Sequence, residues 1–280
     1  MKIFGSYDKN NFDELLCDDK KVILMMEDFF KGVPLEYREK YDKNIDSLNV
    51  LKVDKIKTND MDYEEDTTGI YQQLTNTILF TDSASLVHEF VHMSGFDSEK
   101  YFYPFMDVYL GDAFAEGMTE YLAKLICQRK DVLGYYFEEF IVEMLAMMKE
   151  ELIKQAFVYD KNEFCSLFRD KLSLYNLLVN LNDFSNFQNE KRISKNDRKL
   201  IRENIRNVIR YFNILVNEEE DKQKVKNCKE AFLDGLGTRE VGYLLSDYDK
   251  WYKDFIYQEF MTLRDETKQN RGLIRRLIKR

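Results

Sequence analysis

The chain has 280 residues, of which 44% are hydrophobic, so it can bury a sizeable core as one large domain or two modest ones. Its formal net charge is −9, and such an acidic chain argues against general nucleic-acid binding, which normally uses a basic face. With two prolines and eleven glycines, it has few helix breakers, so long helices are expected.

The cysteines are scattered and form no C-x-x-C pair, which favours free or buried thiols over a disulfide framework or a cysteine zinc site. The first residues lack the basic start and apolar stretch of a signal peptide. No apolar run approaches the roughly 18 residues of a transmembrane helix. These patterns favour a cytoplasmic protein, although a secreted mature form that has lost its leader would look the same. The cysteines are Cys17, Cys127, Cys165 and Cys228.

The first 82 residues predict mixed structure. Residues 22–30 fit either a helix or a buried strand, and residues 47–57 alternate as a strand does. Residues 68–80 are rich in Thr, Ile, Tyr and Phe, and they predict one strand or a short hairpin. A small sheet is therefore expected before the first long helix.

The Thr, Asp and Ser at residues 81–83 predict the start of a helix, and apolar residues at helical spacing follow. Gly95 is placed to end this helix, and a second helix is expected to begin near residues 111–112. The rest is mostly helical in pattern. The sequence thus predicts an α+β, mostly helical fold, with a mixed part over 1–130 and a helical part over 131–280. Further helices are expected over 136–158, 163–181, 196–217 and 245–268.

The only two histidines of the chain, His88 and His92, lie four residues apart with Glu89 between them. Residues four apart project from the same face of a helix, so both imidazoles can reach one metal ion. Glu89 lies about 100° further round the helix, where it can take a proton from a zinc-activated water without binding zinc. The alternative is an amphipathic helix with two histidines on its polar face. The spacing and the adjacent glutamate favour a zinc site.

A catalytic zinc site usually has three protein ligands, and no third histidine is present. We assign Glu116 as the third ligand and Glu120, one turn on, as the carboxylate that orients a ligand histidine. Gly117 costs about 1 kcal/mol in a helix interior relative to alanine, and close approach to the histidine helix would explain it. The alternative for Glu116 and Glu120 is a solvated acidic helix face.

These two motifs together resemble those of the gluzincins, the zinc peptidases with a glutamate as third ligand. The resemblance covers roughly residues 70–127, and Ala115 stands where asparagine is frequent in that clan. It implies a zincin-like fold with an edge strand that binds extended substrate, a zinc-bound water and Glu89 as general base. The G-x-M-E-N motif of zinc aminopeptidases is absent, which favours an endopeptidase. The motifs are His88-Glu89-x-x-His92 and Glu116-Gly117-x-Thr119-Glu120.

Peptide hydrolysis passes through an oxyanion that needs a hydrogen-bond donor besides zinc. Because no histidine remains, a tyrosine or arginine is expected. Tyr109 lies seven residues before Glu116, a spacing similar to that of the catalytic tyrosine in lethal-factor-like proteases. Tyr243 lies in a glycine-flanked segment that resembles a Gly-Tyr helix start of some bacterial gluzincins, and it is slightly preferred. Arg239 is a weaker candidate, and packing is the alternative role for either tyrosine.

The sequence therefore predicts a zinc metallopeptidase that acts on a peptide or protein, with no nucleic-acid partner and no transmembrane segment. One alternative is a zinc-binding regulatory or toxin-like module without proteolysis. Another is a helical interaction protein in which the motif is accidental. The basic, amphipathic residues 271–280 could contact an anionic membrane or an acidic partner, although a charged helix end is the favoured explanation.

Overall fold

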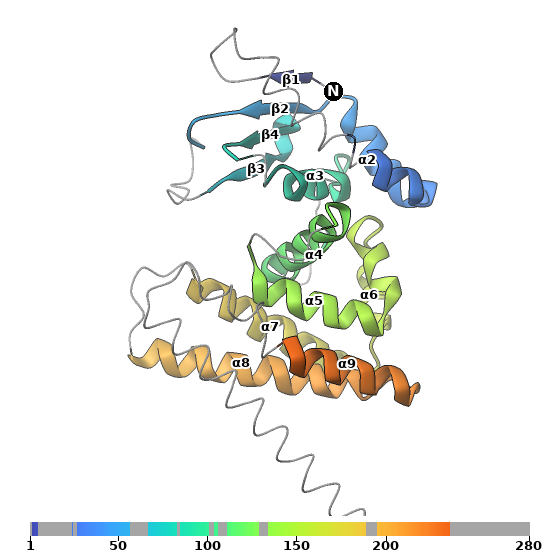
Figure 1. Ribbon diagram of the computed structural model, residues 1–280, viewed down its shortest axis with the longest axis vertical. Helices are drawn as coiled ribbons and strands as arrows, with labels where there is room; N and C mark the ends of the chain where they lie inside the picture. Colours follow the sequence, from blue (N-terminus) through green and yellow to red (C-terminus); the bar gives the residue numbers. More distant parts are fainter. Residues whose placement is uncertain are drawn as a thin grey trace, which may run out of the picture.

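The computed structural model has an α+β, mostly helical fold, as the sequence predicts. A small sheet lies at one end of the molecule, α2 and α3 lie beside it, and the other helices form a body beyond α3 (Figure 1). The structure describes residues 2–4, 24, 27–56, 67–82, 85–100, 104–105, 111–128, 134–188 and 195–235.

The order of elements follows the predicted change from mixed structure to helices. The strands are β1 (Lys2–Phe4), β2 (Asn49–Lys52), β3 (Gly69–Gln72) and β4 (Thr77–Phe80). Residues 27–32 are helical, and the described helices that follow them before residue 130 are α2 (Leu35–Ile45), the 3₁₀ helix η1 (Gln73–Thr75), α3 (Leu86–Gly95) and α4 (Gly111–Ile126). Those after it are α5 (Tyr136–Met148), the 3₁₀ helix η3 (Glu150–Ala156), α6 (Lys161–Ser166), α7 (Lys171–Gln188), α8 (Lys195–Val216) and α9 (Lys222–Gly235).

The described strands form one sheet in the order β1-β2-β4-β3, in which β3 is an antiparallel edge strand. Of the two predictions for residues 68–80, the hairpin is correct. Asn76 adopts the left-handed conformation, with φ 46° and ψ 56°, that turns the chain from η1 into β4. Its side chain donates to the Asn44 carbonyl at 2.8 Å and accepts from the Tyr71 hydroxyl at 2.9 Å. These bonds fasten the turn to the end of α2.

Helix α3 packs between the sheet and α4, so it is buried on several sides. Gly95 is its last residue, as predicted, but none of the described glycines has a positive φ. A Cβ at Gly95 would lie 2.6 Å from the Ala156 carbonyl oxygen. Gly95 is therefore required by close packing against the end of η3 and not by a left-handed conformation.

Helix α4 approaches α5 most closely at Gly117. A Cβ there would lie 2.6 Å from the carbonyl carbon and 2.7 Å from the carbonyl oxygen of Glu138. The sequence analysis attributed this glycine to close approach of α4 to the histidine helix, and that attribution is wrong. The contact instead fixes the first turn of α5 directly beside the residues of α4 that face the histidines.

The helical half is more divided than its periodicity predicts. The helix expected over 136–158 ends at Met148, because Lys149 is extended with φ −135° and ψ 90°, and η3 follows. The helix expected over 163–181 is two helices, and the Asp160 side chain begins the first by accepting from the Glu163 amide at 2.8 Å. The prediction over 196–217 corresponds to α8, whereas 245–268 lies outside the described residues.

A single hydrophobic cluster extends from Phe30, beside the sheet, to Phe232 on α9. It crosses the expected boundary between 1–130 and 131–280, and that division remains a prediction. Cys165 and Cys228 are free thiols, as the sequence favours. In the described segments, no helix combines the length and apolar character needed to cross a membrane.

Candidate metal centre

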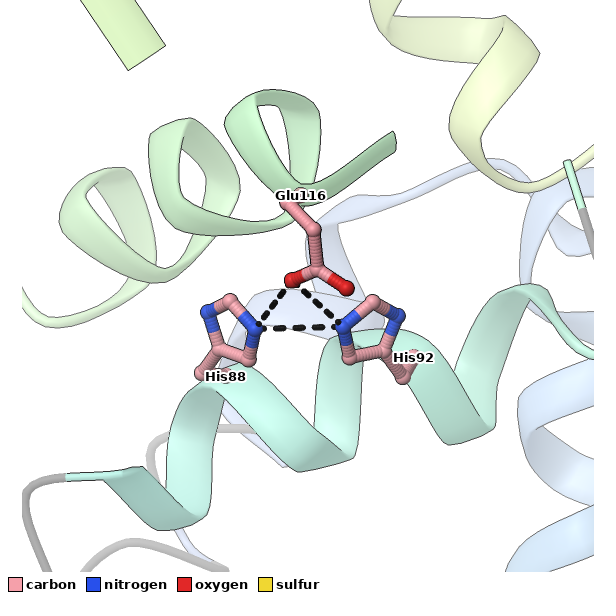
Figure 2. Close-up of side chains that lie close together, drawn as sticks. All are labelled: His88, His92 and Glu116. Carbon is pink, nitrogen blue, oxygen red and sulfur yellow. Dashed lines mark hydrogen bonds and ion pairs between the residues drawn. The ribbon is translucent and has the colours of Figure 1, made fainter. Parts of the chain in front are cut away.

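Helix α3 presents His88 and His92 on the side that faces α4, one helical turn apart. Their Nε2 atoms lie 3.1 Å from each other (Figure 2). The opposite side of α3 carries apolar residues that pack beneath the sheet, including Leu86, Phe90 and Met93. Burial of this apolar stripe therefore directs both histidines toward α4, as the helical spacing predicts.

Glu116 reaches down from α4 between the two imidazoles (Figure 2). Its Oε2 lies 3.0 Å from His88 Nε2 and 3.2 Å from His92 Nε2. Tetrahedral zinc with bonds of about 2.0–2.1 Å places neighbouring ligand atoms about 3.3 Å apart. The three observed separations are close to this value, so His88, His92 and Glu116 could hold a metal ion. The convergence expected from the sequence is thus present.

The charges of the three groups depend on one another. Burial alone would lower the pKa of His88, but hydrogen bonds with Glu116 and Glu120 outweigh it and raise that pKa well above its usual value. Burial would raise the pKa of Glu116, but His92 and the hydrogen bonds with both histidines hold it well below its usual range. Without metal, the site therefore favours a proton on His88, which a metal ion must displace.

Glu120 lies behind His88, one turn after Glu116 on α4. Its Oε2 is 3.0 Å from His88 Nδ1, and the residue is only 2% exposed. This contact leaves Nε2 of His88 directed at Glu116 and His92. Glu120 thus contacts a histidine of the cluster, as expected from the sequence. A buried carboxylate in this position fixes both the orientation of the ring and the nitrogen that carries its proton.

A second group of charges lies further along α4 and α5. Lys124 donates to Glu139 at 2.9 Å and to Glu143 at 2.8 Å. Burial raises the pKa of Glu139 to about 7, although Lys124 opposes this rise. The same carboxylates raise the pKa of Lys124 to about 12 against the effect of burial. Lys124 is therefore committed to this ion pair, which sequence reasoning did not identify.

Glu89 lies beneath the edge strand β3 and interacts electrostatically with both histidines and with Glu116. The backbone N–H of Tyr71 donates a hydrogen bond to its carboxylate. A Cβ at Gly69 would lie 2.8 Å from Glu89 Oε1, so this carboxylate fits against β3 only because residue 69 is glycine. Burial raises the pKa of Glu89, while the two histidines lower it.

Tyr135, which sequence reasoning missed, also lies at this centre. Its ring stacks on that of His88, with 6.0 Å between the centroids and 15° between the planes. The Glu116 carboxylate and then burial hold the pKa of its hydroxyl well above the usual value. Because Tyr135 follows both motifs by many residues, no spacing rule points to it. Its position after Gly134 at a helix start was the one available signal.

The tyrosines proposed from the sequence, Tyr109 and Tyr243, lie outside the described residues, as do Arg239 and the basic segment 271–280. In comparisons with protein-family models, curated proteins and solved structures, none matches this chain. The functional argument therefore depends on the residues of the centre itself.

Proposed function

We propose that this protein is a zinc-dependent peptidase, most simply an endopeptidase. The observation that carries the proposal is the convergence of His88, His92 and Glu116 from two helices, with Glu89 on the same helix as the histidines. Two imidazoles and one carboxylate form a ligand set that zinc hydrolases use with a fourth position open to water. Calcium and magnesium prefer oxygen ligands, so the two imidazoles favour zinc.

When bound, zinc would lower the pKa of a water and polarise a substrate carbonyl. Glu89 is the group that would take the proton from the attacking water and deliver it to the leaving amine. Its burial raises its pKa, and a carboxylate with a raised pKa is better suited to return a proton. Glu120 would hold His88 in the orientation that keeps its Nε2 on the ligand side.

The edge strand β3 supports a peptide substrate. Thr68 and Thr81, just beyond the β3–β4 pair, are joined by a backbone hydrogen bond of 2.8 Å. Since hydrogen-bonded and non-hydrogen-bonded pairs alternate in an antiparallel ladder, the backbone groups of Gly69 and Tyr71 point away from β4. An extended peptide that adds to this edge at Gly69 would lie beside Glu89, which accepts from the Tyr71 N–H.

Two measurements test the proposal against its alternatives. The first is the zinc content of the purified full chain and of His92→Ala. About one zinc per chain, lost in the variant, is expected, whereas a wild type that binds no zinc would favour a helical interaction protein. The second is cleavage of a broad peptide library by the wild type and by Glu89→Gln. The variant should retain zinc and lose cleavage, whereas a zinc-loaded wild type that cuts no peptide would favour a regulatory or toxin-like module.

A further inference from the structure

Three features set the Tyr135 ring beside the metal centre. The first is the stack on His88, whose planes differ by only 15°. The phenol therefore lies in a plane nearly parallel to an imidazole whose Nε2 faces Glu116. The Glu116 carboxylate is also the largest electrostatic influence on the hydroxyl. This influence agrees with the stack, which sets the Tyr135 ring beside the histidine that faces Glu116.

The second feature is the backbone of Tyr135. It has φ 49° and ψ 41°, a left-handed conformation that a bulky side chain rarely adopts. Such conformations persist only where surrounding contacts impose them, and they concentrate at functional sites. Here the conformation turns the chain into α5, and the carbonyl of Tyr135 accepts from the Glu139 amide at 2.7 Å.

The third feature is the close contact between α4 and α5. At Gly117 the two helices approach so closely that a Cβ would overlap the backbone of Glu138, three residues after Tyr135. Gly117 is also the residue directly after Glu116. The contact therefore couples the position of Tyr135 to that of a proposed metal ligand, and no flexible loop intervenes between Tyr135 and this contact.

Tyr135 also borders solvent, because 39% of the residue is exposed. Lys124, a cation two turns after Glu116 on the same helix, is an alternative hydrogen-bond donor. It is held by Glu139 and Glu143 at 2.9 and 2.8 Å, so it is already committed. Among these described donors, Tyr135 alone combines proximity to the centre with access from solvent.

We propose that the Tyr135 hydroxyl donates a hydrogen bond to the anionic oxygen of a ligand bound at this centre and, during hydrolysis, to the oxyanion of the tetrahedral intermediate. The second part rests on the proposed function. The hydroxyl keeps its proton throughout, so it stabilises charge without taking part in proton transfer. In this assignment Tyr135 fills the role for which the sequence suggested Tyr109 or Tyr243.

The test compares Tyr135→Phe with the wild type, with Tyr175→Phe as the matched control because Tyr175 is 50% exposed on α7. Four quantities are measured on the full chain: zinc content, melting temperature, kcat and KM for a cleaved peptide, and affinity for phosphinic tripeptides in which a phosphinate replaces the scissile amide. In Tyr135→Phe, kcat should fall about 10²–10³-fold with KM little changed. Phosphinate affinity should fall at least about tenfold, while zinc content and melting temperature stay at wild-type values. Tyr175→Phe should change none of the four.

The two proposals can fail separately. If Tyr135→Phe keeps both kcat and phosphinate affinity, the Tyr135 assignment is wrong and the peptidase proposal stands. The same holds if Tyr109→Phe or Tyr243→Phe produces the loss and Tyr135→Phe does not. If the zinc-loaded wild type cuts no peptide, the peptidase proposal fails, and phosphinate binding alone decides the Tyr135 assignment. A Tyr135-dependent affinity then supports it, whereas an unchanged affinity or no binding at all overturns it.

Discussion

Replacing Gly117 by alanine tests the packing that positions the centre. The new Cβ would lie 2.6 Å from the carbonyl carbon of Glu138 and 2.7 Å from its oxygen. Carbon atoms in contact normally lie about 3.5–4.0 Å apart, so α4 and α5 must separate by about 1 Å. The obstacle is backbone, which has no alternative rotamer to adopt. Overpacking of this kind costs about 1–3 kcal/mol.

Helix propensity acts in the opposite direction, because alanine is favoured over glycine by about 1 kcal/mol in a helix interior. Because the obstacle is backbone, the overpacking cost should fall in the upper part of its range, about 2–3 kcal/mol, so the expected net loss for Gly117→Ala is about 1–2 kcal/mol. This corresponds to a melting temperature lower by roughly 2–8 °C, at about 2–4 °C per kcal/mol for a domain of this size. Zinc affinity should fall as well, since Glu116 and Glu120 flank the contact.

The assay is thermal unfolding of the metal-free chain, followed by zinc titration against a competing chelator. Gly32→Ala is the matched control, because a Cβ at Gly32 would meet nothing within 4 Å. That control should be neutral or slightly stabilising, since alanine reduces the entropy of the unfolded chain. If Gly117→Ala proved as stable as the wild type or more so, propensity alone would govern the position. The close contact between α4 and α5 would then be refuted.

Four further predictions concern the charges around the centre. Glu120→Ala should weaken zinc binding about 10–100-fold in a chelator competition, because His88 loses the hydrogen-bond partner of its Nδ1. The control is Glu203→Ala at an exposed position, and equal zinc affinities of the two variants would contradict the prediction. Zinc affinity should rise between pH 7 and pH 8, because the raised pKa of His88 leaves a proton on its ring that competes with zinc in this range. A zinc affinity that calorimetry finds unchanged between these pH values would contradict this prediction. In the metal-free chain, the raised pKa of His88 contributes stability that is fully present below the pKa of unfolded histidine, about 6.5. This contribution is lost as the pH rises through the pKa of His88 in the folded chain, so the denaturant midpoint should fall at alkaline pH. Lys124→Met should lower the free energy of unfolding by about 2–4 kcal/mol at pH 8, measured by urea unfolding, and by less at pH 6, because Glu139 has a pKa of about 7 and is protonated there. A loss of stability that does not change with pH would show that the ion pair is not responsible.

The sequence was most informative where chemistry and helical spacing coincide. The rule that residues four apart share a face predicted the pairing of His88 and His92. The absence of a third histidine pointed to a carboxylate or a thiolate. The i, i+4 pair Glu116 and Glu120 supplied both the third member of the cluster and the partner of His88 Nδ1. The hairpin at 68–80 was one of two predictions for that segment, and the structure selects it.

Features that depend on the contact of distant segments could not be predicted. Gly117 was recognised as unusual, but the sequence does not state which backbone approaches it, and the wrong helix was chosen. Tyr135 reaches His88 only because α5 packs on α4, and no local pattern encodes this packing. The same applies to Glu89, whose contact with β3 requires both the edge position of that strand and the missing side chain at Gly69.

The most direct test of the central claim is the zinc dependence of peptide cleavage. Metal-free chain is titrated with zinc while cleavage of a broad peptide library is followed by mass spectrometry, and Glu89→Gln is titrated in parallel. The account predicts that wild-type cleavage rises from zero to a plateau at one zinc per chain, whereas Glu89→Gln binds the same zinc and cleaves nothing. Cleavage without zinc, equal cleavage by Glu89→Gln, or one bound zinc with no cleavage by the wild type would contradict it.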